Sequence, residues 1–107
     1  VQRLMGKPCG VGIMVEAGKD GLQVAGFGRP VTVLRTQSLK SGWDPQGVMV
    51  GDVILSVGEE FMNGRVAAYV EEHLRGPIGS SVEVRFMRRH ADRSQGGQYI
   101  ARLLRDK

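Results

Sequence analysis

Residues 47–57, Gly-Val-Met-Val-Gly-Asp-Val-Ile-Leu-Ser-Val, decide the fold because a turn signal leads directly into a dense run of β-branched side chains. Gly51 gives the backbone the freedom that a tight corner needs, and the Asp52 side chain can accept hydrogen bonds from neighbouring amides. The apolar residues from Val53 to Val57 have the composition of a buried strand. The stretch therefore predicts a strand that the chain enters through a fixed corner.

The segment that follows predicts an amphipathic helix over residues 64–75. Asn63 is a favourable N-cap residue, and Gly76-Pro77 ends the pattern. Five side chains at positions i, i+3, i+4, i+7 and i+8 form one stripe toward the core: Val66, Tyr69, Val70, His73 and Leu74. On this spacing, Glu71 and Glu72 face away from the stripe.

Alternating side chains predict a hairpin at the end of the chain. Val82, Val84 and Phe86 alternate with Glu83, Arg85 and Met87, as in a half-buried strand. Residues 98–104 return as a second strand, and the polar segment between the two strands contains Gly96-Gly97. These two strands are therefore expected to pair through a long exposed tip.

The first half of the chain predicts shorter elements. A glycine-rich turn at residues 10–13 feeds a strand at 13–15, and residues 22–25 form its returning arm. The β-branched composition of residues 31–34 indicates a central strand. Residues 37–46 lack helical periodicity, so we expect a loop there that covers one end of the core.

Length and composition fit one mainly β domain. Its 107 residues are the size of a single domain, so we assign residues 1–107 to one unit with loose ends at 1–9 and 105–107. The predicted elements form a partly open β-barrel or sandwich of five to six strands, capped by an amphipathic helix, with one or two helices in all. Because the sequence starts at Val1 rather than methionine, we expect a piece of a longer protein.

The single cysteine, Cys9, excludes an internal disulfide and a cysteine-based zinc site. It also favours a reducing compartment, so we expect a cytoplasmic protein. No apolar run in the sequence reaches the eighteen or so residues of a membrane span.

The chain lacks the residue patterns of catalysis. Neither His73 nor His90 has a nearby serine or cysteine nucleophile with a third, orienting group in a recognisable motif. The glycine pairs lack the spacing of a dinucleotide-binding or phosphate-binding loop. We therefore expect a protein that is not an enzyme and that needs no cofactor and no metal.

The net charge of +4 is concentrated near the C-terminus, because residues 83–107 carry seven basic and three acidic side chains. Four arginines make up the cluster: Arg85, Arg88, Arg89 and Arg93. This cluster is either a solvated hairpin tip or a weak contact site for anionic lipid headgroups or an acidic partner. It is too small to indicate nucleic-acid binding.

Three motifs together resemble the second half of a PDZ domain. They are residues 51–57, the Leu74-Arg75-Gly76-Pro77 end of the helix, and the alternating strand at 82–86. The Leu-Arg-Gly-Pro ending is most similar to the PDZ domains of C-terminal processing proteases. The resemblance implies a PDZ-like fold, in which a glycine loop binds the C-terminal carboxylate of a partner and the partner's last residues add a strand beside the helix.

Carried over to this sequence, the resemblance implies a peptide site between the strand at 13–15 and the predicted helix. The carboxylate loop comprises Gly10, Val11, Gly12 and Ile13. The strand edge and the helix supply the other contacts, from Met14, Val15, Val66, Ala67, Val70 and Leu74. Because Val66 or Ala67 stands where the commonest PDZ class has histidine, we expect a partner with apolar recognition residues, including its last residue. Met14 is either a groove contact or a core residue.

The predicted function is therefore a non-catalytic adaptor or scaffold module that binds the C-terminal tail or an internal extended segment of a partner by β-strand addition. One alternative is a structural or self-association domain with an occluded groove, in which the insertion at 22–28 pairs with itself or with a second copy of the chain. Another is a substrate-recognition module of a protease whose catalytic domain lies outside this sequence.

Overall fold

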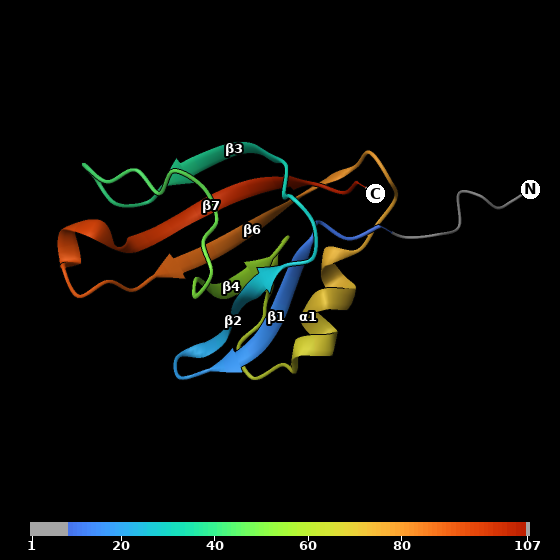
Figure 1. Ribbon diagram of the computed structural model, residues 1–107, viewed down its shortest axis with the longest axis horizontal. Coiled ribbons are helices and arrows are strands. Elements are labelled where there is room, and N and C mark those ends of the chain that lie inside the picture. The colour runs from blue at the N-terminus through green and yellow to red at the C-terminus, as the bar shows by residue number, and fades with distance from the viewer. Residues whose placement is uncertain (1–8, 107) are drawn as a thin grey trace, which may run out of the picture.

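The computed structural model describes residues 9–106 as one seven-stranded antiparallel sheet with a single α-helix, α1 (Ala67–Leu74) (Figure 1). The strands follow the order β1-β2-β4-β6-β7-β3, and β5 pairs with β4. Their bounds are β1 Ile13–Gly18, β2 Gly21–Phe27, β3 Val33–Ser38, β4 Val53–Val57, β5 Glu60–Phe61, β6 Ser81–Arg88 and β7 Gly97–Leu104. The predicted mainly β class is confirmed, as an open sheet with seven strands instead of five to six.

The segment around β4 forms as its sequence predicts. Gly51 has a φ of +94°, and the Asp52 carboxylate accepts a hydrogen bond from the Met49 amide at 3.0 Å, so the corner is closed by its own neighbour. Val53 and Val57 are buried on the strand, which pairs with β2, β5 and β6. The strand thus lies in the middle of the sheet.

The prediction of a central strand at residues 31–34 is wrong. Strand β3 starts at Val33 and occupies the end of the sheet order, with β7 as its partner. Leu34 is 52% exposed there. β-Branched composition indicates a side chain that suits a pleated surface, and an edge strand offers such a surface as well as a central one.

Helix α1 begins later than predicted. Asn63 does not cap it, because residues 63–64 form a turn in which Gly64 has a φ of +80°. Val66 is the N-cap residue, with an extended backbone and no side-chain hydrogen bond to the helix. The glycine turn therefore delays the start of the helix to Ala67 and leaves Val66 at 68% exposure.

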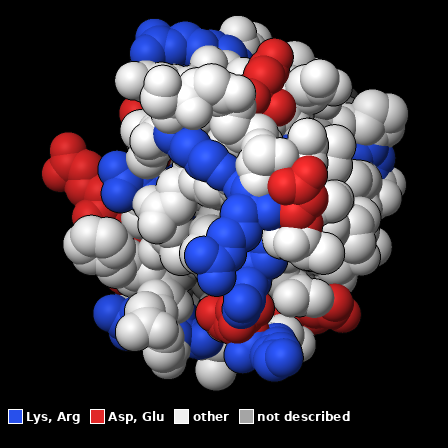
Figure 2. All heavy atoms as spheres, turned by 90° about the vertical axis from the view of Figure 1, so that its left-hand side faces the viewer, with Lys and Arg blue, Asp and Glu red and all other residues white. Residues whose placement is uncertain are grey.

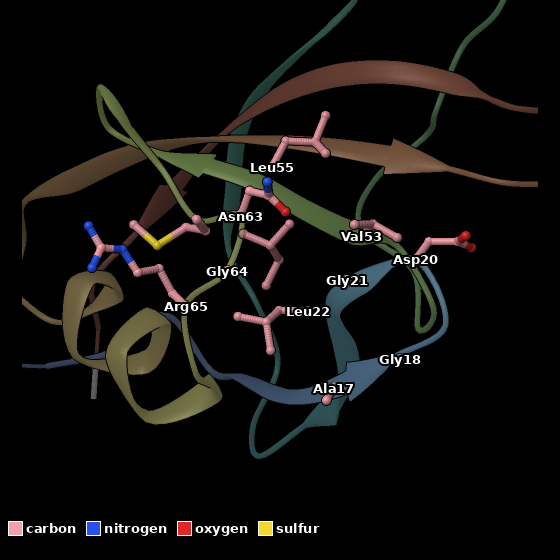
Figure 3. Close-up of a pocket in the computed structure, with 12 residues that line it drawn as sticks. Ala17, Gly18, Asp20, Gly21, Leu22, Val53, Leu55, Asn63, Gly64 and Arg65 are labelled. Atoms are coloured by element: carbon pink, nitrogen blue, oxygen red, sulfur yellow. The ribbon is translucent and has the colours of Figure 1, made fainter.

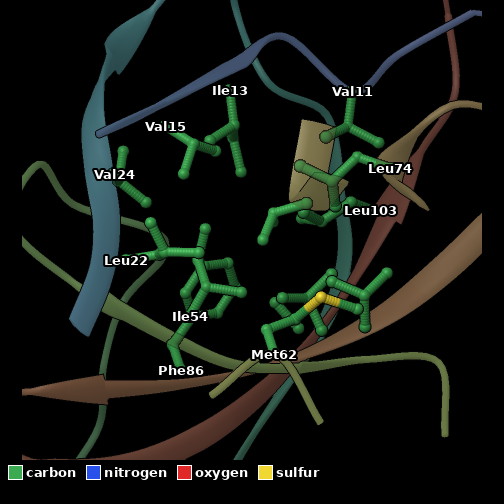
Figure 4. Packing of buried hydrophobic residues seen from close by; sticks show 14 of the residues in the cluster. Val11, Ile13, Val15, Leu22, Val24, Ile54, Met62, Leu74, Phe86 and Leu103 are labelled. Atoms are coloured by element: carbon green, nitrogen blue, oxygen red, sulfur yellow. The ribbon is translucent and has the colours of Figure 1, made fainter. Parts of the chain in front are cut away.

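One hydrophobic cluster lies between the curved sheet and α1 (Figure 4). Val70 and Leu74 are the buried residues of the helix, and they pack with side chains from most of the strands. Trp43, from the loop between β3 and β4, closes one end of the cluster with an edge-to-face contact to Tyr99. No helix among residues 9–106 is both long and apolar enough to cross a membrane.

A buried ion pair joins the start of β4 to the end of β6. Arg88 donates two hydrogen bonds to the Asp52 carboxylate, one to each oxygen, both at 2.9 Å. The Tyr99 hydroxyl donates a third hydrogen bond to the same carboxylate. Burial and the neighbouring Asp52 raise the pKa of Tyr99 above its ordinary value, so the phenol remains a donor.

The same guanidinium fixes the loop that precedes β4. Arg88 also donates to the carbonyls of Pro45 at 2.7 Å and Gly47 at 2.6 Å. It lies 5.5 Å from the Trp43 ring centre and 5.2 Å from that of Tyr99. The hydrogen bonds to Asp52 raise the pKa of Arg88, which keeps the cation charged in spite of its burial.

Replacing Arg88 with methionine leaves the buried Asp52 carboxylate without its cation, and we expect the free energy of unfolding to fall by about 3–5 kcal/mol. Urea denaturation followed by the fluorescence of Trp43 measures this loss. The double variant Asp52→Asn, Arg88→Met carries neither charge and should recover part of the lost stability. A double variant that is no more stable than Arg88→Met would contradict this account.

Candidate functional site

The outer edge of β1 faces helix α1 and pairs with no other strand among residues 9–106 (Figure 1). On its other side, β1 pairs with β2, and the Gly28 amide donates to the Gly12 carbonyl at 2.8 Å. Because the carbonyl and amide of a trans peptide point in opposite directions, the Ile13 amide points away from β2. The Val15 amide also points outward, since it donates to the Glu71 carboxylate of α1 at 3.1 Å.

The glycine loop before β1 is oriented by an arginine. Arg29 Nη2 donates to the Gly10 carbonyl at 2.7 Å, and the Asp106 amide donates to the same oxygen at 3.3 Å. The Val11 amide, in the same peptide plane, therefore points the other way. Within residues 9–106, no group accepts a hydrogen bond from the Val11 or Gly12 amide. The loop thus has donors available for an anion.

Backbone contacts fix the C-terminal end of α1 beside this loop. Cys9 and Gly76 exchange two backbone hydrogen bonds, at 2.8 and 3.0 Å. The Arg105 guanidinium donates to the Leu74 carbonyl at 3.0 Å and to the His73 carbonyl at 3.4 Å, so a cation caps the helix C-terminus. Cys9 and Arg105 are therefore held in place rather than loose, whereas residues 1–8 and 107 of the predicted loose ends lie outside the described residues.

A cluster around Glu60 anchors α1 to β5. The Tyr69 hydroxyl donates to the Glu60 carboxylate, which also lies 3.1 Å from His73 Nε2 and 3.5 Å from Arg65. The hydrogen bond from Tyr69, with smaller contributions from His73 and Arg65, lowers the pKa of Glu60 below its ordinary value. This cluster fixes the face of the helix that β1 meets.

Four apolar residues of the predicted peptide site pack against one another. Val11, Ile13 and Leu74 have exposed fractions of 2%, 8% and 2%, and Val70 is fully buried. Figure 4 shows the side chains of Val11, Ile13 and Leu74 directed into one cluster. The structure thus brings these predicted residues together, in a closed arrangement.

The other predicted contacts are spread over different surfaces. Val15 is on β1 with its side chain in the core, while Met14 is 47% exposed and lies over Gly26 of β2. Val66 precedes the helix and is largely exposed, and Ala67 packs partly against the core. Met14 is therefore on the face of β1 opposite to Ile13 and Val15.

Two charged residues of the site were missed from the sequence. Glu71 was expected to face away, yet it reaches β1, because it lies four residues after Ala67 and three before Leu74 on one face of the helix. Arg75 lies beside the glycine loop, with its Cγ 4.0 Å from the position of a Cβ on Gly10. Glu71 lies three residues before the buried Leu74, and this helical spacing indicates that the two side chains share a face. The predicted stripe began at Val66 instead, and this choice placed Glu71 on the outer face.

A pocket of about 350 Å³ opens where β1 leaves the helix (Figure 3). Leu22 of β2 and Leu55 of β4 line two of its sides, and Asn63 and Arg65 line a third. Ala17, at the end of β1, also borders it. The edge of β1 therefore runs from the glycine loop at one end to this pocket at the other.

Three arginines of the predicted cluster, Arg88, Arg89 and Arg93, line one hollow with His90, while Arg85 lies apart from them. Arg88 is committed to Asp52, and Arg85 lines a separate hollow on β6 with Glu59 and Glu83. Arg89 is exposed but pairs with Asp20 at 2.5 Å. Figure 2 shows acidic side chains among the basic ones at this end of the molecule. Arg93 is exposed in the short 3-10 helix Arg93–Gln95.

A scan against protein-family models finds no matching family, and a search of the curated proteins finds no match. Fold and site therefore define a class only: a small, mainly β domain with a free strand edge beside one helix. Residues 9–106 contain no cluster of three or more His, Cys, Asp or Glu side chains that could hold a metal ion.

The lowered pKa of Glu60 predicts a pH-dependent contribution to stability. A carboxyl whose pKa is lower in the folded state stabilises the fold above its unfolded pKa, here about 4.5, and loses that contribution as the pH falls through the folded value. Tyr69→Phe removes the hydroxyl that contributes most to the shift. We expect its deficit in free energy of unfolding to be complete near pH 7 and to shrink below about pH 4.5.

Urea denaturation of the wild-type chain and of Tyr69→Phe between pH 3 and 7 measures this deficit. The double variant Glu60→Gln, Tyr69→Phe is the control. Because Glu60→Gln has no carboxylate at this position, the difference in free energy of unfolding between the double variant and Glu60→Gln should not change with pH. A Tyr69→Phe deficit of constant size over the whole pH range would argue against a bond between Tyr69 and ionised Glu60.

Proposed function

We propose that this chain is a non-catalytic protein-interaction module, which binds the C-terminal tail of a partner protein as an added strand on the outer edge of β1. One observation carries the proposal. The Val15 amide, on an edge strand, is satisfied by the carboxylate of Glu71 rather than by a neighbouring strand. The Glu71 oxygen lies where a carbonyl of an added strand would accept that hydrogen bond.

The backbone pattern on either side of Val15 suits strand addition. In an antiparallel strand, the amide and carbonyl of one residue point to the same side, so Val15 offers both an outward donor and an outward acceptor. The Ile13 amide also points outward, and it lies two residues nearer to the glycine loop than the Val15 amide. A peptide that runs antiparallel to β1 would pair with Val15 and end at the loop.

The glycine loop and Arg75 favour a free carboxylate at that end. The Val11 and Gly12 amides have no acceptor within residues 9–106. The Arg75 side chain passes Gly10 with its Cγ, and its exposed guanidinium, which pairs with Glu72 at 3.3 Å, would have to turn toward the loop to meet a carboxylate. The resemblance to PDZ domains points to the same place and direction for a peptide. These features support a C-terminal tail over an internal extended segment.

Binding requires the apolar residues of the site to separate. An apolar last side chain reaches Ile13 and Leu74 only when they move apart, because both are buried in the unbound form. The Glu71 carboxylate must also leave the Val15 amide. Both steps offset part of the binding energy, so we expect affinities in the micromolar range, about −8 kcal/mol at 1 μM.

Two uses of such a module are compatible with this site. As part of an adaptor or scaffold, the site would hold a partner tail in place. The Leu74-Arg75-Gly76-Pro77 ending resembles that of protease PDZ domains, and in that setting the same site would present a substrate tail to a catalytic domain outside this sequence.

A fluorescent hexapeptide with a free C-terminal valine should bind with a dissociation constant of roughly 1–100 μM, and its amidated twin at least about tenfold more weakly. Fluorescence anisotropy measures both. N-methylation two residues before the valine removes the donor for the Val15 carbonyl and should abolish binding. Equal binding of the free acid, the amide and the N-methylated peptide would overturn the proposal.

Arg75→Gln should weaken binding of the free acid, whereas Arg65→Gln, at the other end of the helix, is the matched control. A bulky residue at Gly12 is a poor test, because a Cβ there would lie 3.0 Å from the Arg29 carbonyl at a φ of +96°. Such a variant strains the loop whether or not a peptide binds.

A second candidate function, self-association, is favoured by the other edge of the sheet. The insertion at 22–28 is largely within β2, between β1 and β4, so it is not free to pair with a second copy. Strand β3 has no partner on its outer side among residues 9–106, and it exposes Leu34. Two β3 edges could pair about a twofold axis.

Light scattering after size exclusion tests this candidate. If β3 mediates self-association, the wild-type chain should form dimers as its concentration rises, and Leu34→Lys should remain monomeric because two lysines would then meet at the twofold contact. Leu39→Lys, just outside β3, is the control. A wild-type chain that is monomeric at millimolar concentration would exclude this function.

A further inference from the structure

We propose that the partner tail carries a lysine or arginine two residues before its last residue, and that Glu71 selects it. The inference rests on the proposed function and names the class of ligand more closely. It keeps the apolar last residue but replaces the apolar preference that Val66 or Ala67 suggested at the earlier position, because Val66 precedes α1 and is 68% exposed. It starts from the position of the Glu71 carboxylate, which bonds to the Val15 amide at 3.1 Å on the groove side of β1.

The hydrogen-bonding register fixes which ligand residue meets Glu71. Outward amides on β1 recur every second residue, at Ile13 and Val15. If the terminal residue is placed at the glycine loop, opposite Ile13, the residue opposite Val15 is two positions earlier. Glu71 contacts Val15, so this earlier residue lies nearest to its carboxylate.

Glu71 of α1 and the C-cap residue Arg75 carry opposite charges at the spacing of an extended peptide. Arg75 follows Glu71 by four residues, which is a rise of about 6 Å along a helix. Two residues of an antiparallel strand span about 6.8 Å. A tail with its carboxylate at the glycine loop therefore places the side chain of the residue two positions earlier close to Glu71. Arg75 can meet the carboxylate if its guanidinium leaves Glu72, with which it pairs at 3.3 Å.

Strand addition would leave Glu71 in need of a new partner. Among residues 9–106, the Val15 amide is its one hydrogen-bond donor, and no Lys, Arg or His pairs with it. A peptide carbonyl that takes over the Val15 amide removes that donor. An ammonium or guanidinium group on the ligand replaces it with a charge-assisted hydrogen bond, whereas an acidic side chain is repelled.

The selection is specific to one position of the ligand. Side chains of successive strand residues point to opposite faces, so the residues one and three positions before the end are directed away from the helix. A lysine there remains in solvent and contributes only through screened, longer-range attraction. Position therefore distinguishes this contact from general attraction between a basic peptide and an acidic site.

The test uses free-acid hexapeptides ending in valine, with lysine, glutamine or glutamate placed one, two or three residues before the end. We expect lysine two residues before the end to bind at least about fivefold more tightly than glutamine there, with glutamate weakest. The preference should disappear in Glu71→Gln, which retains an acceptor for the Val15 amide, and should turn toward glutamate in Glu71→Lys. Glu59→Gln has the same change in net charge at an exposed turn and should bind as the wild type does.

Two failures can be told apart. Free acids that bind better than their amides but show no lysine preference, or a preference that persists in Glu71→Gln, would overturn the role of Glu71 and leave the proposed function standing. If no free acid binds better than its amide, the proposed function fails and the inference falls with it.

Discussion

The buried ion pair between Asp52 and Arg88 determines where four segments of this domain meet. Asp52 directly precedes β4, Arg88 ends β6 and Tyr99 comes from β7. The loop before β4 joins them because its carbonyls accept hydrogen bonds from the same guanidinium. A buried charge is costly unless all its hydrogen bonds are satisfied, so each segment has one low-energy position. The central strands are thereby aligned, and the peripheral strands are arranged around them.

The position of the β1 edge depends on this ion pair indirectly, through β2. Strand β2 meets β4 at the corner, where the Val24 amide donates to the Asp52 carbonyl, and β1 then pairs with β2. Helix α1 is held at one end by Cys9 and Arg105 and at the other by the Glu60 cluster. The contacts that hold β1 and those that hold α1 together fix the distance between the two elements. The Glu71 carboxylate can therefore reach from the helix to the strand.

Sequence reasoning predicted the elements whose pattern is local, and it erred where position in the sheet decides. Strand β4, the final hairpin and the loop at Trp43 follow from alternation and turn residues. The edge position of β3 does not, because composition carries no information on which strands are neighbours. Arg88 was assigned to an exposed cluster although it lies two residues after Phe86, on the inner face of β6 by strand alternation. Its partner Asp52 is thirty-six residues away, so only the fold reveals the pair.

The two free edges of the sheet differ in a way that bears on selectivity. An unpaired edge strand accepts almost any extended chain, and proteins commonly block such edges with charged side chains. Glu71 gives the β1 edge that protection, since its carboxylate occupies the Val15 amide and repels acidic segments. No comparable carboxylate bonds to the backbone of β3 among residues 9–106. A ligand displaces the Glu71 carboxylate most readily if it supplies both a carbonyl for the Val15 amide and a cation for the carboxylate. Protection of the edge and selection of the ligand would then depend on the same side chain.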